Sequence, residues 1–336
     1  MRNETRVLYN DYRRIVAQVN GVEDAREMFT VAPPIAQSME DTIREEAGFL
    51  DRIGSQTVIN MKGETIGLDI GSTVASVTKT SGTTEEREPV EVVSLEKTNE
   101  YEVDQVDFDT AIRYSTLDQW RVYPDFAERY ARQLARQIGR DRIMIGWHGE
   151  GRAALKSDRV VNPRLQDVAK GWLAKISEFA PDRIHTDPLT LGTAGDYKNL
   201  DALVYDLIEN KMAEHHREDT DLVCIVGRRL LHDKYLGLMN DNNAATERIA
   251  LDVLFSTRQV AGMPAIVVPF FPADGILVTR LDNLSIYTQE GSLRRLMRER
   301  PEKNRVEDFM SQNMDYVIED YTCLAQVAAG AITLAN

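Results

Sequence analysis

The chain has 336 residues and carries 54 acidic against 40 basic side chains, a formal net charge of −14. This balance argues against a dedicated nucleic-acid-binding protein, which normally presents a basic face. No apolar run reaches the roughly 18 residues of a membrane-spanning helix, and no secretory signal is recognisable, so we expect synthesis in the cytosol. The length suits one complex domain or two to three subdomains.

Residues 1–29 predict an amphipathic helix whose pattern ends at Gly21. Its expected inward stripe consists of Leu8, Tyr12, Ile15 and Val19. Residues 31–34 (VAPP) follow, and because proline blocks a helix and restrains the residue before it, we expect an extended, protease-accessible linker. A second helix is expected from Ser38, a favourable N-cap residue, to Ile53.

Residues 63–100 are rich in Thr, Ser, Gly and Glu and hold few large apolar side chains. Short alternations around a turn at residues 79–84 predict a long two-stranded hairpin. An isolated hairpin is marginally stable in water and exposes its edges, so such an arm needs a partner surface. The pattern therefore favours oligomerisation, although a disordered loop explains the composition equally well.

Residues 101–112 predict the strand that returns from this arm. Apolar side chains fall on odd positions at Val103 and on even positions from Val106, so we expect a β-bulge at residues 104–105. A helix of roughly 20 residues, about 30 Å long, is expected from Pro124. Its expected inward stripe consists of Phe126, Tyr130, Leu134 and Ile138.

The second half of the chain alternates between expected helices and strands, which predicts an α+β subdomain. Cys224 lies in an apolar stretch and is expected to be a buried thiol without a disulfide. The helices are expected at residues 164–179, 199–213, 228–239 and 244–254, and the strands at 222–226, 265–269, 276–281, 284–289 and 314–321.

Residues 67–73 (GLDIGST) are similar to the phosphate-binding turn of actin-like ATPases and sugar kinases. That family also needs a second Asp-Gly turn and a glycine-rich adenosine loop downstream, and residues 200–336 offer neither in a suitable context. A phosphotransferase is therefore the alternative function, and a Gly- and Ser-rich stretch of the arm is the preferred interpretation.

No catalytic, cofactor-binding or metal-binding residues are expected. His215 and His216 are adjacent and therefore point to different faces, with no third ligand at helical spacing. The densest basic stretch includes Arg294, Arg295 and Arg298, with glutamates interleaved that dilute any phosphate-binding field. We interpret it as a solvated or intersubunit ion-pair face, with a nucleic-acid patch as the alternative. The candidate complementary residues on the arm are Glu85, Glu86 and Glu88.

Residues 162–173 (NPRLQDVAKGWL), called the signature segment below, resemble the major capsid protein family of P-two-like (peduovirus) tailed phages. Each further matching stretch is short, but together they follow the family's order. They are residues 61–64 (MKGE), 101–120, 221–235, 268–274 (VPFFPAD), 284–287 (LSIY) and 314–321 (MDYVIEDY).

The resemblance implies a Hong Kong 97-type capsid fold and a chain that assembles into an icosahedral shell without catalysing a reaction. Another virion structural protein is a further alternative. The resemblance implies cleavage between Phe29 and Thr30. Its implied partners are further copies of the chain, an internal scaffolding protein, a maturation protease, a portal protein and packaged double-stranded DNA without sequence specificity, but no membrane. It places the chain in the virion, and in the host cytoplasm during assembly. The implied parts are an N-terminal segment (1–29), an N-terminal arm (30–60), an extended loop (61–115), a peripheral domain (116–199 and 285–336) and an axial domain (200–284).

Overall fold

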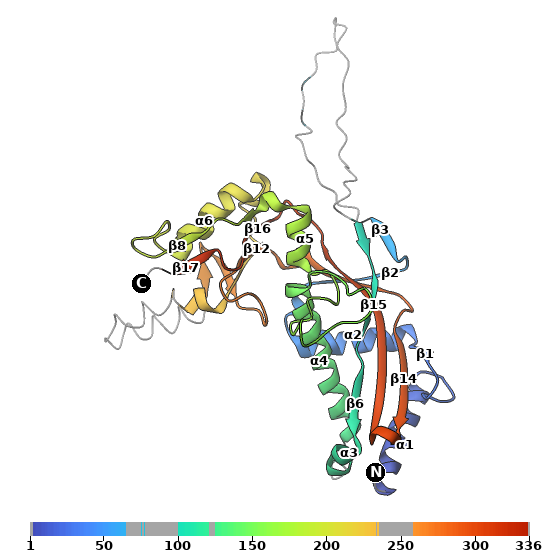
Figure 1. Cartoon of the computed structure of the whole chain (residues 1–336). Coiled ribbons are helices and arrows are strands. Elements are labelled where there is room, and N and C mark those ends of the chain that lie inside the picture. The colour runs from blue at the N-terminus through green and yellow to red at the C-terminus, as the bar shows by residue number, and fades with distance from the viewer. Residues whose placement is uncertain are drawn as a thin grey trace, which may run out of the picture.

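The computed structural model describes residues 3–64, 75, 77, 100–120, 125–232, 234 and 258–334. These residues build an elongated lobe around one sheet and a smaller lobe around a second sheet (Figure 1). Each lobe has its own cluster of buried apolar side chains. Residues 67–73, the turn at 79–84 and residues 244–254 lie outside the described part, so the predictions made for them stay predictions.

The first sheet is organised by one 14-residue strand, β15 (Arg305–Ile318). Ser311 pairs with Arg294 on one edge and with Asp107 on the other. Strand β15 therefore lies in the middle of the first lobe and contacts most of its other strands. It pairs with β5 (Asp104–Asp107), β6 (Thr110–Arg113), β13 (Leu284–Gln289) and β14 (Arg294–Arg300), while β1 (Phe29–Thr30) pairs with β14 and β2 (Gly54–Val58) pairs with β13.

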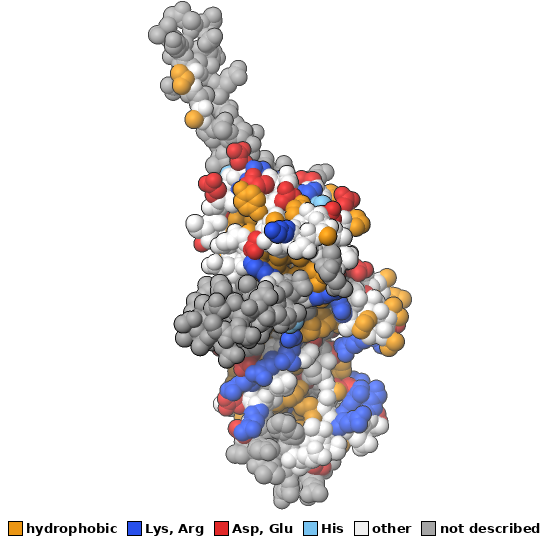
Figure 2. All heavy atoms as spheres, turned by 90° about the vertical axis from the view of Figure 1, so that its left-hand side faces the viewer, with side chains coloured by type: hydrophobic (Ala, Val, Ile, Leu, Met, Phe, Trp, Pro, Cys, Tyr) orange, Lys and Arg blue, Asp and Glu red, His pale blue; other side chains and the backbone are white. Residues whose placement is uncertain are grey.

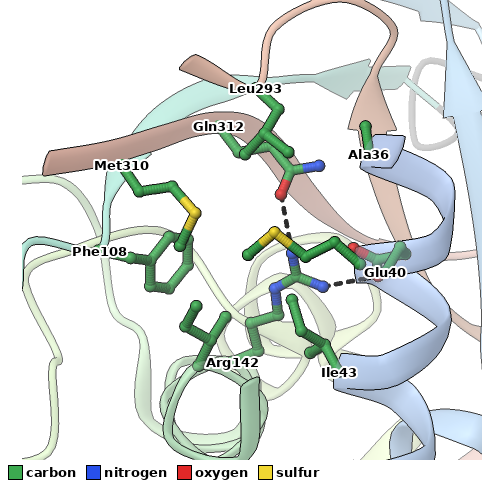
Figure 3. Close-up of a pocket in the computed structure, with 10 residues that line it drawn as sticks. Ala36, Glu40, Ile43, Phe108, Arg142, Leu293, Met310 and Gln312 are labelled. Atoms are coloured by element: carbon green, nitrogen blue, oxygen red, sulfur yellow. Dashed lines mark hydrogen bonds and ion pairs between the residues drawn. The ribbon is translucent and has the colours of Figure 1, made fainter. Parts of the chain in front are cut away.

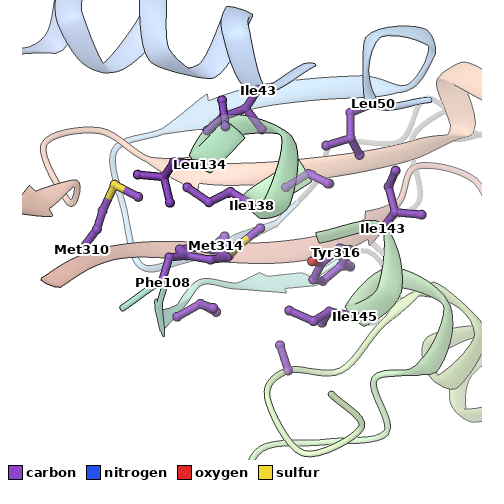
Figure 4. Packing of buried hydrophobic residues seen from close by; sticks show 14 of the residues in the cluster. Ile43, Leu50, Phe108, Leu134, Ile138, Ile143, Ile145, Met310, Met314 and Tyr316 are labelled. Atoms are coloured by element: carbon purple, nitrogen blue, oxygen red, sulfur yellow. The ribbon is translucent and has the colours of Figure 1, made fainter. Parts of the chain in front are cut away.

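Helix α4 (Phe126–His148) is the long helix that the apolar stripe predicted. Figure 4 shows Leu134 and Ile138 of this helix between Ile43 of α2 (Pro33–Ala47) and Met314 of β15. All four side chains are buried. The long helix is therefore packed on both sides, by helix α2 and by the central strand.

Helix α1 (Asn3–Val19) forms as expected, and Tyr12 of the predicted inward stripe packs against the core, but the other two described residues of the stripe do not. Ile15 and Val19 are 51% and 55% exposed, whereas Tyr9 and Val16 are buried. The buried face is therefore rotated relative to the predicted stripe, and it also includes a polar contact, the hydrogen bond from Thr5 to Asp118 at 2.5 Å.

Pro33 and Pro34 open helix α2 instead of forming a linker, and the helix ends at Ala47. The first helical turn lacks N–H partners, so proline costs nothing there and its fixed φ is favourable. Gly48 ends the helix at φ +64°, a conformation that suits glycine. The 3₁₀ turn η1 (Leu50–Arg52) follows.

The expected β-bulge at residues 104–105 is absent. Strands β5 and β6 pair with β15 in one continuous register, while β4 (Glu100–Glu102) pairs instead with β3 (Lys62–Glu64). Val103 packs with Tyr287, and Val106 lies in the other core cluster, on the opposite face. The change of phase in the sequence therefore marks a strand that changes partner and buries both faces.

The second lobe contains a six-stranded sheet in which β9 (Leu222–Val226) is fully buried, as predicted for Cys224 and its neighbours. Helix α6 (Leu200–Lys211) begins at Asn199, whose side chain accepts a hydrogen bond from Ala202 N–H at 2.9 Å. The other strands of the sheet are β7 (Ile184–His185), β10 (Gln259–Val260), β11 (Met263–Ile266), β12 (Ile276–Arg280) and β16 (Leu324–Val327). A separate pair joins β8 (Leu189–Leu191) to β17 (Ile332–Leu334).

Two expectations about the second half need correction. The helix expected at residues 164–179 is shorter: α5 spans Trp172–Phe179, and the preceding residues form turns, with Leu165 at φ +60°. Strand β14 was not predicted, because its sequence is basic. The remaining short elements are α3 (Tyr114–Trp120), η3 (Pro181–Arg183), η4 (Glu214–His216), η5 (Leu281–Asn283) and η6 (Pro301–Lys303). None of the described helices is long and apolar enough to cross a membrane.

Candidate functional site

Trp172, in the signature segment, is the centre of the first lobe. Its ring is fully buried, with centroids 4.9 Å from Trp147 and 5.1 Å from Tyr316. The indole N–H donates to the carbonyl of Ser285 at 3.1 Å. One side chain therefore joins helix α5 to α4 and to the first sheet.

Two glycines let the signature segment lie directly against the end of α4. A methyl group at Gly146 would collide with the ring of Trp172, and one at Gly171 would collide with the carbonyl oxygen of Gly146. Gly171 N–H also donates to the carbonyl of Gly149 at 3.0 Å. The residue types of this segment are thus explained by close packing, and they form no catalytic arrangement.

A buried ion pair lies next to the base of the predicted arm. Lys175 Nζ is 2.8 Å from both carboxylate oxygens of Asp315, and each side chain is only 10% exposed. The same carboxylate accepts hydrogen bonds from the backbone N–H groups of Glu102 and Tyr316. Burial raises the pKa of Asp315, against the opposing effect of the Lys175 charge. The pair connects α5, β15 and β4.

A second buried ion pair attaches helix α2 to the long helix α4 (Figure 3). Arg142 is 1% exposed, and its guanidinium donates to Glu40 at 2.6 Å and to Gln312 at 2.8 Å. The adjoining cavity has a volume of about 10 Å³, lined also by Phe108 and Met310. A cavity of that size has room for about one water molecule and for no substrate.

Sequence reasoning missed both buried ion pairs. Lys175 sits three residues after Trp172, on the face that is otherwise apolar, and Asp315 interrupts an apolar strand. A charged residue at an inward position was the available signal, but the sequence gives no indication of which charge meets which.

The predicted basic face is partly internal. Arg295 contacts Asp308 at 2.7 Å and the Tyr12 hydroxyl at 2.9 Å, and its side chain is only 14% exposed. Burial opposes this charge, but the hydrogen bonds and negative charge that Asp308 and Tyr12 supply together outweigh that effect and raise the pKa of Arg295. Arg295 is thus engaged inside the subunit, and its role as an intersubunit contact stays a prediction. Arg294 and Arg298 are exposed and remain candidates.

The other candidate residues are placed as follows. Phe29 and Thr30 form strand β1 and pair with Arg295 and Arg294 of β14. Glu85, Glu86 and Glu88 lie outside the described residues, as do residues 67–73. His216 Nε2 lies within hydrogen-bond distance of Asp320, at 3.0 Å. Among the residues that the structure describes, no three His, Cys, Asp or Glu side chains are grouped to hold a metal ion.

A long helix packed across a sheet, an antiparallel strand pair at the base of the segment 65–99 and a separate second lobe together define a Hong Kong 97-type phage capsid fold, shared with solved phage capsids. Residues 8–329 match the family described as phage major capsid protein, P2 family. The chain belongs to this family: it is a major capsid protein, a shell component of a tailed phage virion.

Individual relatives agree with this assignment. The chain is 43% identical to the "Capsid proteins" sequence of Escherichia phage P2, over 97% of this chain and 95% of the relative. It is 36% identical to the major capsid protein of Serratia phage KSP20, over 96% and 95% of the two chains. A solved procapsid of satellite phage P4 that includes the size determination (Sid) protein aligns with a TM-score of 0.82 at 41% identity, covering 100% of this chain and 99% of the other.

Proposed function

We propose that this major capsid protein acts only through assembly and catalyses no reaction. The observation that carries the proposal is the family match over residues 8–329, on a fold whose most prominent features are packing contacts and buried ion pairs. Repeated heterologous contacts between identical subunits close into a shell when their rotations are compatible. The alternative of an actin-like phosphotransferase has only residues 67–73 in its favour.

The two cores support a division into a peripheral and an axial domain. The first lobe corresponds to the proposed peripheral domain and the second to the proposed axial domain around the symmetry centres. Residues 184–191 and 324–334 are part of the second lobe through β7, β8, β16 and β17, so we assign them to the axial domain. Residues 30–60 remain the N-terminal arm and residues 61–115 the extended loop.

Cleavage between Phe29 and Thr30 would release the N-terminal segment. Strand β1 has only two residues, so it is a short element that can open for a protease, although Phe29 is buried in the folded subunit. Mass spectrometry of DNA-filled particles should find Thr30 as the first residue. An intact Met1 or Arg2 terminus in such particles would contradict this step.

The partners follow from the same role. They are further copies of the chain, an internal scaffolding protein, a maturation protease and the portal protein, together with double-stranded DNA bound without sequence specificity. The net charge of −14 suits a shell that does not grip its DNA. We propose no membrane partner.

Electron microscopy of the purified, concentrated protein tests the proposed function. Closed shells support a capsid protein, whereas tubes or rings would favour another virion component. Replacing residues 75–95 with a short Gly-Ser linker supplies a second test. We expect a soluble subunit that melts cooperatively but no longer forms shells, because few large apolar side chains are removed. Closed particles from this variant would refute a role of the arm in assembly.

A further inference from the structure

The loop between α4 and α5 presents three apolar side chains to solvent. Leu155 is 100% exposed, Val160 90% and Val161 72%. Isolated exposed apolar residues are ordinary, but three within seven positions of one loop indicate a contact surface. We call Leu155, Val160 and Val161 the apolar tip.

The apolar tip is held in place by the signature segment. Asp167, within that segment, accepts a hydrogen bond from Asp158 N–H at 2.7 Å. Asp158 in turn accepts from the N–H groups of Val160 at 2.8 Å and Val161 at 3.3 Å. Ala153 N–H donates to the carbonyl of Asp167 at 2.8 Å. These bonds fix the backbone that carries the exposed side chains, so binding there orders little additional chain.

The charge of the loop is opposite to that of the whole chain. Residues 152–164 contain four basic residues and one acidic residue, in a chain of net charge −14. The single acidic residue, Asp158, is occupied by the loop's own N–H groups. The basic side chains are all exposed: Arg152, Lys156, Arg159 and Arg164. Figure 2 shows that Lys and Arg side chains also form a band over the lower half of one face, at the level of α4 in Figure 1.

We propose that the apolar tip and its basic side chains dock on an acidic surface of a second copy of this chain in the shell. This proposal rests on the proposed assembly function and identifies one surface through which subunits would contact each other. A second copy fits because every subunit carries a net charge of −14, opposite in sign to the loop, whereas DNA would gain from the basic side chains but not from the three apolar ones. The signature segment then acts in assembly by holding this loop in shape.

Thiol labelling tests the location directly. Cys224 and Cys323 are buried, so a Val160→Cys variant offers a single reactive thiol to a maleimide reagent. We expect rapid labelling of unassembled subunits, at least tenfold slower labelling in closed shells, and recovery when the shells are dissociated. The unchanged chain is the control for background labelling. Equal labelling in shells and free subunits would overturn the proposal.

Assembly of apolar-tip variants tests the contribution of the contact. Leu155→Ser/Val160→Ser/Val161→Ser should raise the protein concentration needed for shells by about tenfold or more, with an unchanged melting temperature of the subunit. The matched control Leu155→Met/Val160→Ile/Val161→Ile keeps the tip apolar and should assemble like the unchanged chain. Lys156→Glu/Arg159→Glu should also weaken assembly, most strongly at low salt.

The outcomes separate this inference from the proposed function. If the unchanged chain forms no closed shells, both fail. If shells form, and the serine variant assembles at the same concentration as the unchanged chain, only this inference fails. Protection of Val160→Cys by added DNA in the absence of shells would identify nucleic acid as the occupant and would also overturn it.

Discussion

Replacing Lys175 with methionine should destabilise the unassembled subunit by roughly 3–5 kcal/mol. The substitution leaves Asp315 as an unpaired charge at a site where both side chains are 10% exposed. The ammonium group now contacts both carboxylate oxygens at 2.8 Å, and methionine of similar length replaces it with an apolar end.

A second substitution separates the effect of charge from that of packing. In Lys175→Met/Asp315→Asn the side-chain amide that replaces the carboxylate is neutral. Its oxygen can still accept a hydrogen bond from one of the two backbone N–H groups, those of Glu102 and Tyr316, that donate to Asp315 in the unchanged chain. We therefore expect the double variant to recover more than half of the lost unfolding free energy. The buried Trp147 and Trp172 provide a fluorescence signal for urea unfolding of this lobe.

The loss of stability in Lys175→Met should depend on pH, in a direction set by the pKa of Asp315. Burial already raises the pKa of Asp315, and loss of Lys175 should raise it further. A carboxyl whose folded pKa is raised favours folding at low pH, and this contribution is lost as the pH rises through the folded pKa. The penalty of Lys175→Met should therefore shrink as the pH is lowered. A cost below about 1 kcal/mol, or a double variant no more stable than the single one, would refute an energetically coupled buried pair.

Further substitutions test other parts of the chain. Leu134→Ala should cost roughly 2–5 kcal/mol in urea unfolding because the side chain is buried against α2 and β15, whereas exposed Arg140→Ala should stay within about 0.5 kcal/mol. Equal effects of these two would contradict the assigned faces of α4. Gly146→Ala should cost about 1–3 kcal/mol or more, since its methyl group meets Trp172, and a silent result would argue against that close approach. Calorimetry with ATP and magnesium should detect no binding to the unchanged chain, and micromolar binding abolished by Asp69→Ala would revive the phosphotransferase alternative.

The spacing of apolar residues along the chain was sufficient to predict several helices and strands from the sequence alone. Leu134 and Ile138 recur at helical spacing, and the stripe they form is the buried face of α4. Residues 222–226 are uniformly apolar and form a fully buried strand. In such segments buried positions recur with the period of the helix or strand. The spacing of apolar residues along the chain therefore predicts both the element and its buried face.

Predictions from proline and from charge were wrong where the role of a residue depends on its position in the fold. Pro33 and Pro34 read as a helix block, yet they occupy the first helical turn, where no N–H partner is needed. The basic run at 294–300 was interpreted as a solvated or intersubunit ion-pair face, yet it is a strand in which Arg295 is paired with Asp308 of the same subunit. Neither distinction is visible without knowing where the helix starts or which strand lies alongside.

The sequence by itself determined the family, through the signature segment and the order of the matching stretches, and with it the fold class and the role in the shell. Only the tertiary structure decided how that segment works. Trp172 fills the first core, while Asp167 fixes the loop that exposes Val160. It also decided that Lys175 meets Asp315 across 140 positions of the chain. Contacts at such separation depend on how the strands and helices pack, and the local pattern of residue types carries no information about that packing.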